Sequence, residues 1–168
     1  MTKKMALIAL VAGALFLSGC NQQGKDAAAP KVEAVAQAPL VAPPADNAQA
    51  WKLYLVNVAK QHMEGIRSSP FMYYLPSQDA EDFDEQYQRQ VDNVGGAVMR
   101  GVLPGNMLAF GSPASGRMAD LIVEAFQHVP AGSMKDVRVL FIGSSDDLER
   151  VRTAVEPSGA NVVFHEVK

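Results

Sequence analysis

The sequence predicts a small three-layer α/β sandwich built on a mostly parallel sheet of three or four strands. Three compact apolar runs, residues 107–110, 137–142 and 161–167, alternate with two helical patterns, residues 115–127 and 145–155. Strands separated by helices and short loops favour right-handed crossovers, which place the strands parallel in one sheet. The alternative is an α+β domain in which one edge strand runs antiparallel.

The first part of the domain supplies one more helix and one more strand. Asp46 followed by Gln49 is a capping pattern, and the apolar series behind it predicts one amphipathic helix that ends before Ser68. Residues 71–75 form a short apolar run stopped by Pro76, which indicates a buried strand.

A second amphipathic helix is expected between this strand and the strand at 107–110. Its apolar positions follow the acids of residues 79–85, which suit the positive end of a helix dipole. The helix should end near Gly95-Gly96. Residues 97–106 fit either a strand or a further turn of helix closed by Pro104-Gly105.

Composition narrows the classes of function. The chain has 168 residues, a formal net charge of -3, a sequence pI near 5.6 and one cysteine. Nucleic-acid binding needs clustered Lys and Arg, so no nucleic-acid partner is expected. A single cysteine excludes an intramolecular disulfide and a zinc site built from paired thiolates. The histidines are isolated in sequence and the acids at 79–85 lack calcium-loop spacing, so neither a metal site nor a cofactor is expected.

The N-terminus has the pattern of an export signal. Two lysines, at positions 3 and 4, precede an uncharged run at residues 5–17 that is dominated by Ala and Leu. That run is too short to span a hydrocarbon core of about 30 Å, for which a helix needs roughly 20 apolar residues. A basic head, a short apolar run and small residues indicate a secretory signal peptide covering residues 1–19.

The only cysteine follows directly, in the segment Leu17-Ser18-Gly19-Cys20. This segment resembles the lipobox of bacterial lipoproteins. The resemblance implies diacylglycerol on the Cys20 sulfur, cleavage before Cys20 and acylation of the new amino terminus, and it covers the first twenty residues alone. Several acyl chains exceed the two-signal threshold for stable anchoring. Because Asn21 stands where an aspartate would signal inner-membrane retention, the expected location is the outer membrane, facing the periplasm.

Residues 20–45 link the lipidated end to the folded domain. The segment is rich in Ala and Pro and lacks Trp, Phe and Tyr, so it cannot bury enough surface to offset its backbone entropy. It is predicted to be a disordered or partly polyproline-II tether. Loss of Lys3 and Lys4 with the signal leaves thirteen basic and eighteen acidic side chains, a formal charge of -5. The single periplasmic α/β domain is assigned to residues 46–168.

Two loops, Ser112–Arg117 and Gly143–Asp146, follow neighbouring strands, at the edge where open α/β sheets bind ligands. The first has the glycine spacing of a phosphate-binding loop, but Arg117 replaces its lysine and Met118 replaces the Ser or Thr that holds magnesium. The alternative interpretation is helix capping, by Ser115 in the first loop and by Ser144 or Ser145 in the second. The candidate anion or ligand contacts are Ser112, Ser115, Gly116, Arg117, Ser144 and Ser145.

Aromatic side chains are concentrated at the start of the domain. Aromatic residues are common in the cores of protein interfaces, and they also fill the core of a domain of this size. The candidate partner-facing residues are Trp51, Tyr54, Tyr73 and Tyr74.

Two hypotheses about function follow. The favoured one is an anchored envelope lipoprotein whose α/β domain binds or scaffolds a periplasmic protein or an envelope polymer. The alternative is an anchored receptor or enzyme that takes a small ligand or anion at the two loops. The chain has neither a G-x-S-x-G elbow nor a G-x-G-x-x-G segment, so a typical α/β-hydrolase or dinucleotide binder is not indicated, and no catalytic residue is assigned.

Overall fold

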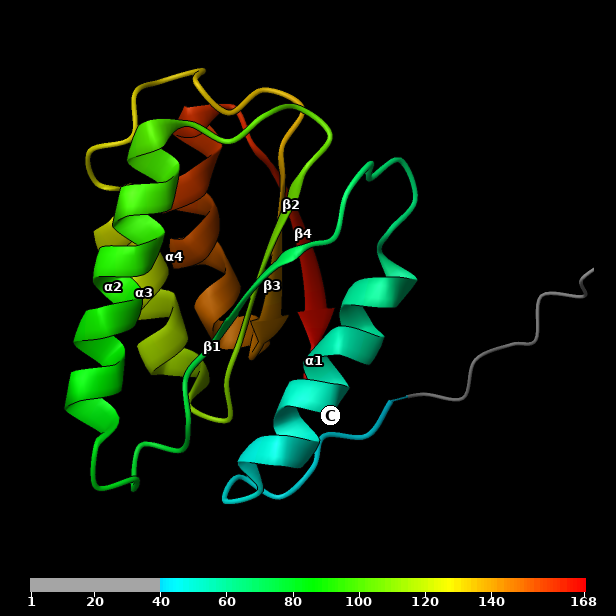
Figure 1. Ribbon diagram of the computed structural model, residues 1–168, viewed down its shortest axis with the longest axis vertical. Coiled ribbons are helices and arrows are strands. Elements are labelled where there is room, and N and C mark those ends of the chain that lie inside the picture. Colours follow the sequence, from blue (N-terminus) through cyan, green and yellow to red (C-terminus); the bar gives the residue numbers. More distant parts are fainter. Residues whose placement is uncertain (1–39) are drawn as a thin grey trace, which may run out of the picture. The chain divides into compact units, whose positions relative to one another are not determined.

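The computed structural model describes residues 40–168, which form a four-stranded sheet with helices on both faces (Figure 1). In chain order the elements are α1 (Ala48–Gln61), β1 (Phe71–Tyr74), α2 (Phe83–Arg100), β2 (Met107–Gly111), α3 (Ser115–Phe126), β3 (Arg138–Gly143), α4 (Ser145–Val155), a short 3-10 turn η1 (Glu156–Ser158) and β4 (Asn161–Glu166). The predicted signal peptide, Cys20 and most of the predicted tether lie outside the described residues.

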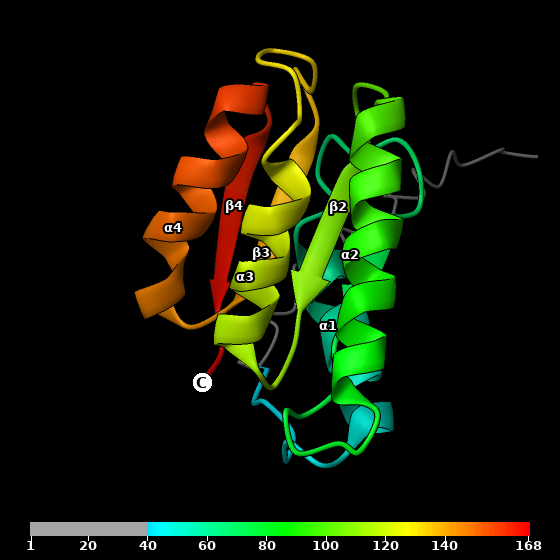
Figure 2. The same ribbon diagram turned by 90° about the vertical axis from the view of Figure 1, so that its left-hand side faces the viewer.

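The sheet has the order β1-β2-β3-β4, and all three strand pairs are parallel. The predicted three-layer α/β fold is thus confirmed, and the alternative with an antiparallel edge strand is wrong. The strand order follows the chain order, so every right-handed crossover turns to the same side. The helices α2, α3 and α4 therefore lie side by side on one face (Figure 2), and α1 lies on the other.

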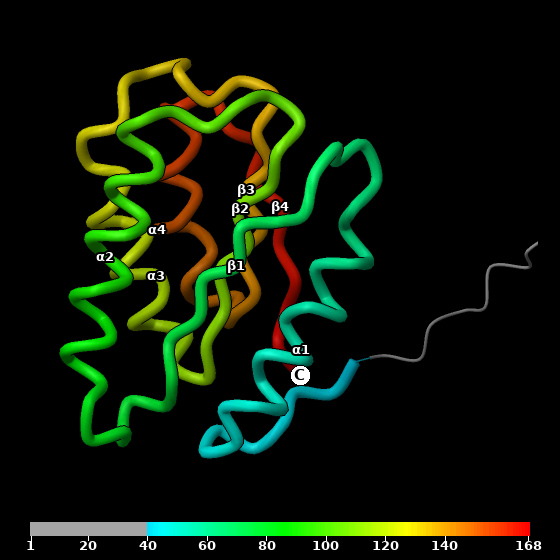
Figure 3. The backbone as a smooth tube through the Cα atoms, viewed as in Figure 1, coloured from blue at the N-terminus to red at the C-terminus, as the bar shows by residue number. Residues whose placement is uncertain are grey.

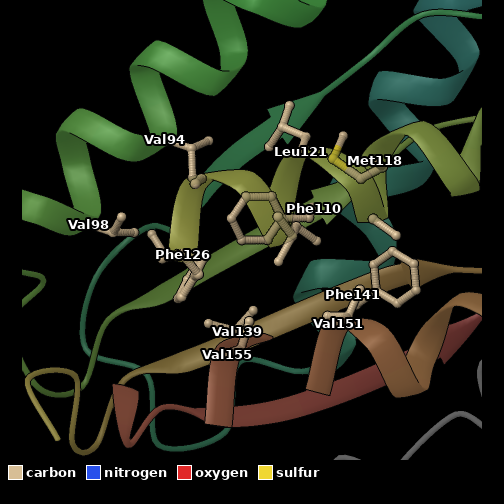
Figure 4. Close-up of a cluster of buried hydrophobic side chains, with 14 of the residues drawn as sticks. Val94, Val98, Phe110, Met118, Leu121, Phe126, Val139, Phe141, Val151 and Val155 are labelled. Atoms are coloured by element: carbon tan, nitrogen blue, oxygen red, sulfur yellow. The ribbon is translucent and has the colours of Figure 1, made fainter. Parts of the chain in front are cut away.

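The larger hydrophobic core lies between the sheet and these three helices. Val94 and Val98 of α2 and Leu121 of α3 meet Phe110 of β2 and Phe141 of β3 (Figure 4). These five side chains are at most 2% exposed. Burial of this kind stabilises by roughly 1.5–3 kcal/mol for each large apolar side chain, so this layer fixes how α2 and α3 lie on the sheet.

The smaller core lies under α1. Trp51, Leu55 and Val58 of this helix pack on Met107 of β2 and Leu140 of β3, and all five are buried. The helix approaches the sheet closely because β2 ends in a glycine. A Cβ at Gly111 would collide with the Leu55 side chain and lie 3.2 Å from Cβ of Ile142.

The packed part of the chain begins before the predicted domain boundary at Asp46. Leu40 and Ala42 pack against the core under α1, and the backbone N–H of Ala42 donates to the carbonyl of Lys168 at 3.0 Å. This bond ties the beginning of the described chain to its end.

Helix α1 differs from its prediction at both ends. Its N-cap is Asn47, whose Oδ1 accepts the N–H of Ala50 at 3.0 Å, and not Asp46. The helix stops at Gln61, whereas the apolar series continues to Ile66. Ile66 still packs against the core under α1, but it does so from a turn that includes Gly65 at φ 76°. The apolar pattern thus continued beyond the helix itself.

Helix α2 continues through Gly95-Gly96, where the sequence predicted its end. Neither glycine has a positive φ, and buried Val94 and Val98 on either side hold the helix against the core. It ends instead at Gly101, which has φ 89°. Of the two options for residues 97–106, the further turn of helix is correct for its first part, and the remainder is a loop.

Candidate functional site

The two predicted loops meet at the carboxyl edge of the sheet, because β2 and β3 are parallel neighbours. The meeting point is the hydroxyl of Ser115, the first residue of α3. It accepts the backbone N–H of Ser144 at 2.8 Å and donates to Oδ2 of Asp147 on α4 at 2.6 Å. One side chain thus joins the beginnings of two neighbouring helices.

Arg150 on α4 extends this contact into a network. Its Nε and Nη2 donate to Oδ1 of Asp147 at 3.1 Å and 2.7 Å, and Nη2 also donates to the carbonyl of Gly116 at 2.6 Å. Its Nη1 forms an ion pair with Asp120 of α3. Together these residues form the α3–α4 latch: Ser115, Gly116, Asp120, Asp147 and Arg150.

Arg117, the residue that replaces the lysine of a phosphate loop, is also engaged inside the protein. Its Nη1 lies 3.3 Å from Oδ2 of Asp120. Its guanidinium carbon stands over the Tyr87 ring at 4.3 Å from the centroid and over Phe83 of α2 at 5.6 Å. Such cation–π contacts hold the Arg117 guanidinium against α2.

The latch and its neighbours affect two titratable groups. Burial, reinforced by the nearby Glu124 carboxylate that accepts its hydroxyl hydrogen at 3.2 Å, raises the pKa of Tyr87 to about 12. Burial of Arg150 favours its neutral form, but the hydrogen bonds with Asp147 and Asp120 outweigh that effect and raise its pKa. Both groups are therefore fixed in one protonation state at neutral pH.

The other loop serines have local roles. Ser112 is 1% exposed; its hydroxyl accepts the N–H of Ala114 at 2.9 Å and donates to the Pro76 carbonyl at 3.4 Å. Ser144 caps α4 by accepting the N–H of Asp146 at 3.2 Å, as the capping interpretation predicts, and Ser145 is exposed.

Ser115 does not cap α3. The capping position belongs to Ala114, and the Ser115 hydroxyl bonds across to α4. Gly143 makes this contact possible: a Cβ there would lie 2.6 Å from Ser115 Oγ and 2.5 Å from Cζ of Phe141. The end of β3 and the start of α3 therefore lie so close together that only glycine fits at position 143.

The sheet topology bears on ligand binding at this edge. In open α/β sheets the binding crevice opens where the strand order reverses. The described strands run β1-β2-β3-β4 without a reversal, so that crevice does not form between β2 and β3. An anion placed there would also face the carboxylates of Asp120 and Asp147. Among residues 40–168, no group of three or more His, Cys, Asp or Glu side chains is placed to hold a metal ion.

Asp120 and Arg150 are not among the site residues that the sequence predicts. Each belongs to an i,i+3 pair within its own helix, Arg117 with Asp120 and Asp147 with Arg150, and that spacing is visible in the sequence. The bond that joins the two pairs connects residues 30 positions apart. Nothing local in the sequence indicates it.

The four candidate partner-facing aromatics separate into two groups. Trp51 and Tyr54 are 3% and 5% exposed and belong to the core under α1. Tyr73 stacks on Phe110 at 4.9 Å, and Tyr74 lies half-buried with the Lys52 ammonium 5.4 Å from its ring centroid. Only the β1 tyrosines therefore retain surface that a partner can touch.

Two histidines come together near the core under α1. The rings of His62 and His165 lie edge to face with centroids 5.8 Å apart, and the Tyr54 ring is 6.3 Å from that of His165. Burial, with the charge of nearby Arg138, lowers the pKa of His62. Burial, with His62 and Lys168, lowers the pKa of His165. The pair is thus neutral at pH 7.

A groove with a volume of about 670 Å³ lies between α3 and α4. Its apolar wall includes Val123 and Phe126 of α3 and Ala154 of α4, and the charged side chains Glu149 and Arg150 lie along it. The groove starts beside the α3–α4 latch, which sets the spacing of its two helical walls. It offers an apolar surface with a charged rim, the composition typical of a site for a protein segment.

No protein-family model, curated protein or solved structure matches this chain. No helix within residues 40–168 is both long and apolar enough to cross a membrane.

Proposed function

We propose that this protein is an acylated lipoprotein of the cell envelope whose α/β domain is a binding or scaffolding module for a periplasmic protein or envelope polymer. The sequence Leu17-Ser18-Gly19-Cys20 behind a basic and apolar N-terminus supports the anchor. Asn21 in place of an aspartate favours the outer membrane. The Ala-rich segment between Cys20 and the packed residues that begin at Leu40 would let the domain stand away from the bilayer.

One observation favours a binding module over a receptor for small anions. The side chains that would hold an anion are already bonded within the protein: the Ser115 hydroxyl to Ser144 and Asp147, and the Arg117 guanidinium to Asp120 and the Tyr87 ring of α2. An incoming anion would have to break these bonds beside two carboxylates. The loops at the sheet edge act as structural joints, which leaves the outer surface of the helices for function.

The groove between α3 and α4 is the part of that surface that best fits a protein partner. Its wall is apolar, its rim carries both signs of charge, and the latch holds its two sides together. A photoreactive benzoylphenylalanine at Gln127, an exposed groove residue, should form an adduct with the partner in intact cells. The same probe at exposed Gln88 on α2 is the matched control and should give none.

A blocking variant makes this experiment decisive. Ala154→Arg, which fills the groove from the α4 side, should abolish the Gln127 adduct without changing the amount of membrane-bound protein. Equal adducts from Gln127 and Gln88, or an adduct that survives Ala154→Arg, would refute the groove as the binding surface. Calorimetric binding of phosphate that Arg117→Ala removes would instead establish the anion receptor.

The anchor has a separate test. Cys20→Ala should abolish labelling by radioactive palmitate and move the protein from the membrane fraction to the soluble fraction. Palmitate labelling that persists in Cys20→Ala would exclude the lipoprotein assignment. The groove experiment does not depend on this result, because the adduct at Gln127 can form with or without the anchor.

A further inference from the structure

The two edges of the sheet are protected unequally. Exposed edge strands commonly carry charged residues that prevent pairing with another strand. The β4 edge follows this rule, because Glu166, the last residue of β4, is charged and forms an ion pair with Lys168 at 3.3 Å. The β1 edge carries no charged residue at all, and Phe71 and Met72 remain 50% and 37% exposed on its two faces.

The β1 edge is also accessible. The strand lies at one end of the sheet, between α1 and α2 (Figures 1 and 3). A hollow of about 400 Å³ borders it, lined by Met72 and Tyr74 of the strand, Val56 of α1 and Gln90 of α2. A second hollow, of about 370 Å³, lies beside Phe71. The backbone edge is therefore flanked by open space along its length.

The helices flanking this edge carry acids at one end and bases at the other. Residues near the end of β1 are mostly acidic. Lys52, 5.4 Å from the Tyr74 ring centroid, and Arg89, which pairs with Glu85 at 3.9 Å, offset part of this charge. The acids there are Asp79, Glu81, Asp82, Asp84 and Glu85, with Asp46 before α1. Near the start of β1, Lys60 ends α1 and Arg100 ends α2 beside Phe71. Arg67 and Glu64 precede the strand there and offset each other.

We infer that the β1 edge pairs with the β1 edge of a second copy of this chain, antiparallel about a two-fold axis at Met72. A two-fold axis reverses the strand, so the acidic end of each copy meets the basic end of the other. Met72 then faces its own counterpart, and Phe71 faces Tyr73 of the second copy on the opposite face of the sheet. A strand pairing of this kind merges the two sheets into one.

The charges along the β1 edge favour a second copy of this chain over an unrelated extended peptide. A surface that runs from acidic to basic is complementary to its own reverse, which a second copy supplies in full. The strand has only four residues, so the pairing buries little area and is expected to be weak in dilute solution. A test must therefore capture the paired state.

Cysteine crosslinking provides that capture, because Cys20 is the only cysteine of the chain. In a full-length Cys20→Ser background purified in mild detergent, Met72→Cys introduces a single thiol that the two-fold axis places opposite itself. Directly opposed residues in an antiparallel pair have Cβ atoms about 4.5–5.5 Å apart, close enough to disulfide geometry for oxidation to link them. Mild oxidation should give a covalent dimer that reducing agent reverses.

Glu149→Cys on α4 is the matched control, since it places an exposed thiol on another face of the domain. It should stay monomeric under the same oxidation. Equal dimer from both variants would show random collision and overturn the inference, as would a Met72→Cys protein that has a native circular dichroism spectrum and stays monomeric.

A charge reversal tests the partner's identity without any cysteine. Arg100→Asp reverses the charge beside Phe71 and should reduce the dimer that chemical crosslinking detects in the parent chain. Arg152→Asp on α4 is the same charge change away from this edge and should leave the amount of dimer unchanged. An Arg100→Asp protein that keeps its fold and gives as much dimer as the parent chain would show that a second copy does not pair with this edge. Neither result depends on Cys20 or on the groove between α3 and α4.

Discussion

Replacing Gly143 by alanine is expected to destabilise the domain by about 2 kcal/mol. The added Cβ would lie 2.5 Å from Cζ of Phe141 and 2.6 Å from Oγ of Ser115, distances that neither neighbour tolerates. Phe141 is fully buried, so it has little freedom to move. The sheet edge and the start of α3 must therefore separate, which stretches the bond from the Ser144 N–H to Ser115.

The magnitude follows from three contributions. Overpacking a dense core costs about 1–3 kcal/mol, and weakening one partly buried hydrogen bond costs about 1 kcal/mol. Alanine also restricts the unfolded chain, which offsets about 0.4–1 kcal/mol. The balance is a loss of about 2 kcal/mol.

Gly95→Ala is a control with the same chemical change. Gly95 lies inside α2, and a Cβ there would meet nothing within 4 Å. Alanine is favoured over glycine within a helix by about 1 kcal/mol, so this variant should be more stable than the parent chain. The two substitutions are predicted to have opposite signs.

Equilibrium unfolding in urea measures both variants. Trp51 is the single tryptophan and is 3% exposed, so its fluorescence reports loss of the core under α1, while circular dichroism reports the helices. A Gly143→Ala protein as stable as the parent, or a Gly95→Ala protein destabilised as strongly as Gly143→Ala, would refute the close-approach argument.

Three further outcomes are expected. Arg150→Met keeps the packing of the α3–α4 latch but removes its ion pairs, and should cost about 1–2 kcal/mol in urea unfolding, with a smaller cost at high salt because the groups are partly exposed. The lowered pKa values of His62 and His165 mean that the unfolded chain takes up protons first as the pH falls. The contribution of the two histidines to the free energy of unfolding is therefore fully present above about pH 6.5, and it is lost as the pH falls through their lowered pKa values in the folded chain. His165→Gln should flatten this pH dependence of the free energy of unfolding, measured from pH 8 to 5. Ultraviolet titration should place ionisation of Tyr87 near pH 12, and Glu124→Gln should lower that value.

The strands and crossover helices could be predicted from sequence because each depends on local pattern. Runs such as 107–110 and 139–142 are apolar throughout, as strands covered on both faces must be. The helical patterns between the runs leave room only for crossovers. The layer arrangement then follows from crossover handedness. The arrangement of α1 alone on its face follows only once the strand order is known.

Boundaries that depend on tertiary packing were less predictable. Glycines at 95 and 96 favour a helix end by their intrinsic preference, but buried valines on either side keep α2 intact to Arg100. Similarly, the apolar spacing that continues to Ile66 marks contact with the core and not continuation of α1. At Gly95-Gly96 and at Ile66, packing against the core, and not intrinsic helix propensity, determines where the helix ends.

The polar site depended most on long-range structure. Sequence indicated that two serine-containing loops would share one sheet edge, and they do, but it assigned Ser115 to capping α3. The observed bond from Ser115 to Asp147 requires that Gly143 have no side chain, and a separate ion pair from Arg150 to Asp120 joins the same two helices. These relations exist only after the two helices are placed side by side.

The position of α1 has a mechanical consequence. Any pull on the chain that precedes Leu40 enters the domain through α1, after the single backbone bond from Ala42 to Lys168 has given way. The helix can separate from the sheet without disturbing the hydrogen bonds among the four parallel strands. Tension would therefore uncover the apolar sheet face under α1 first, while the three helices on the other face remain packed, and Trp51 fluorescence would report the change.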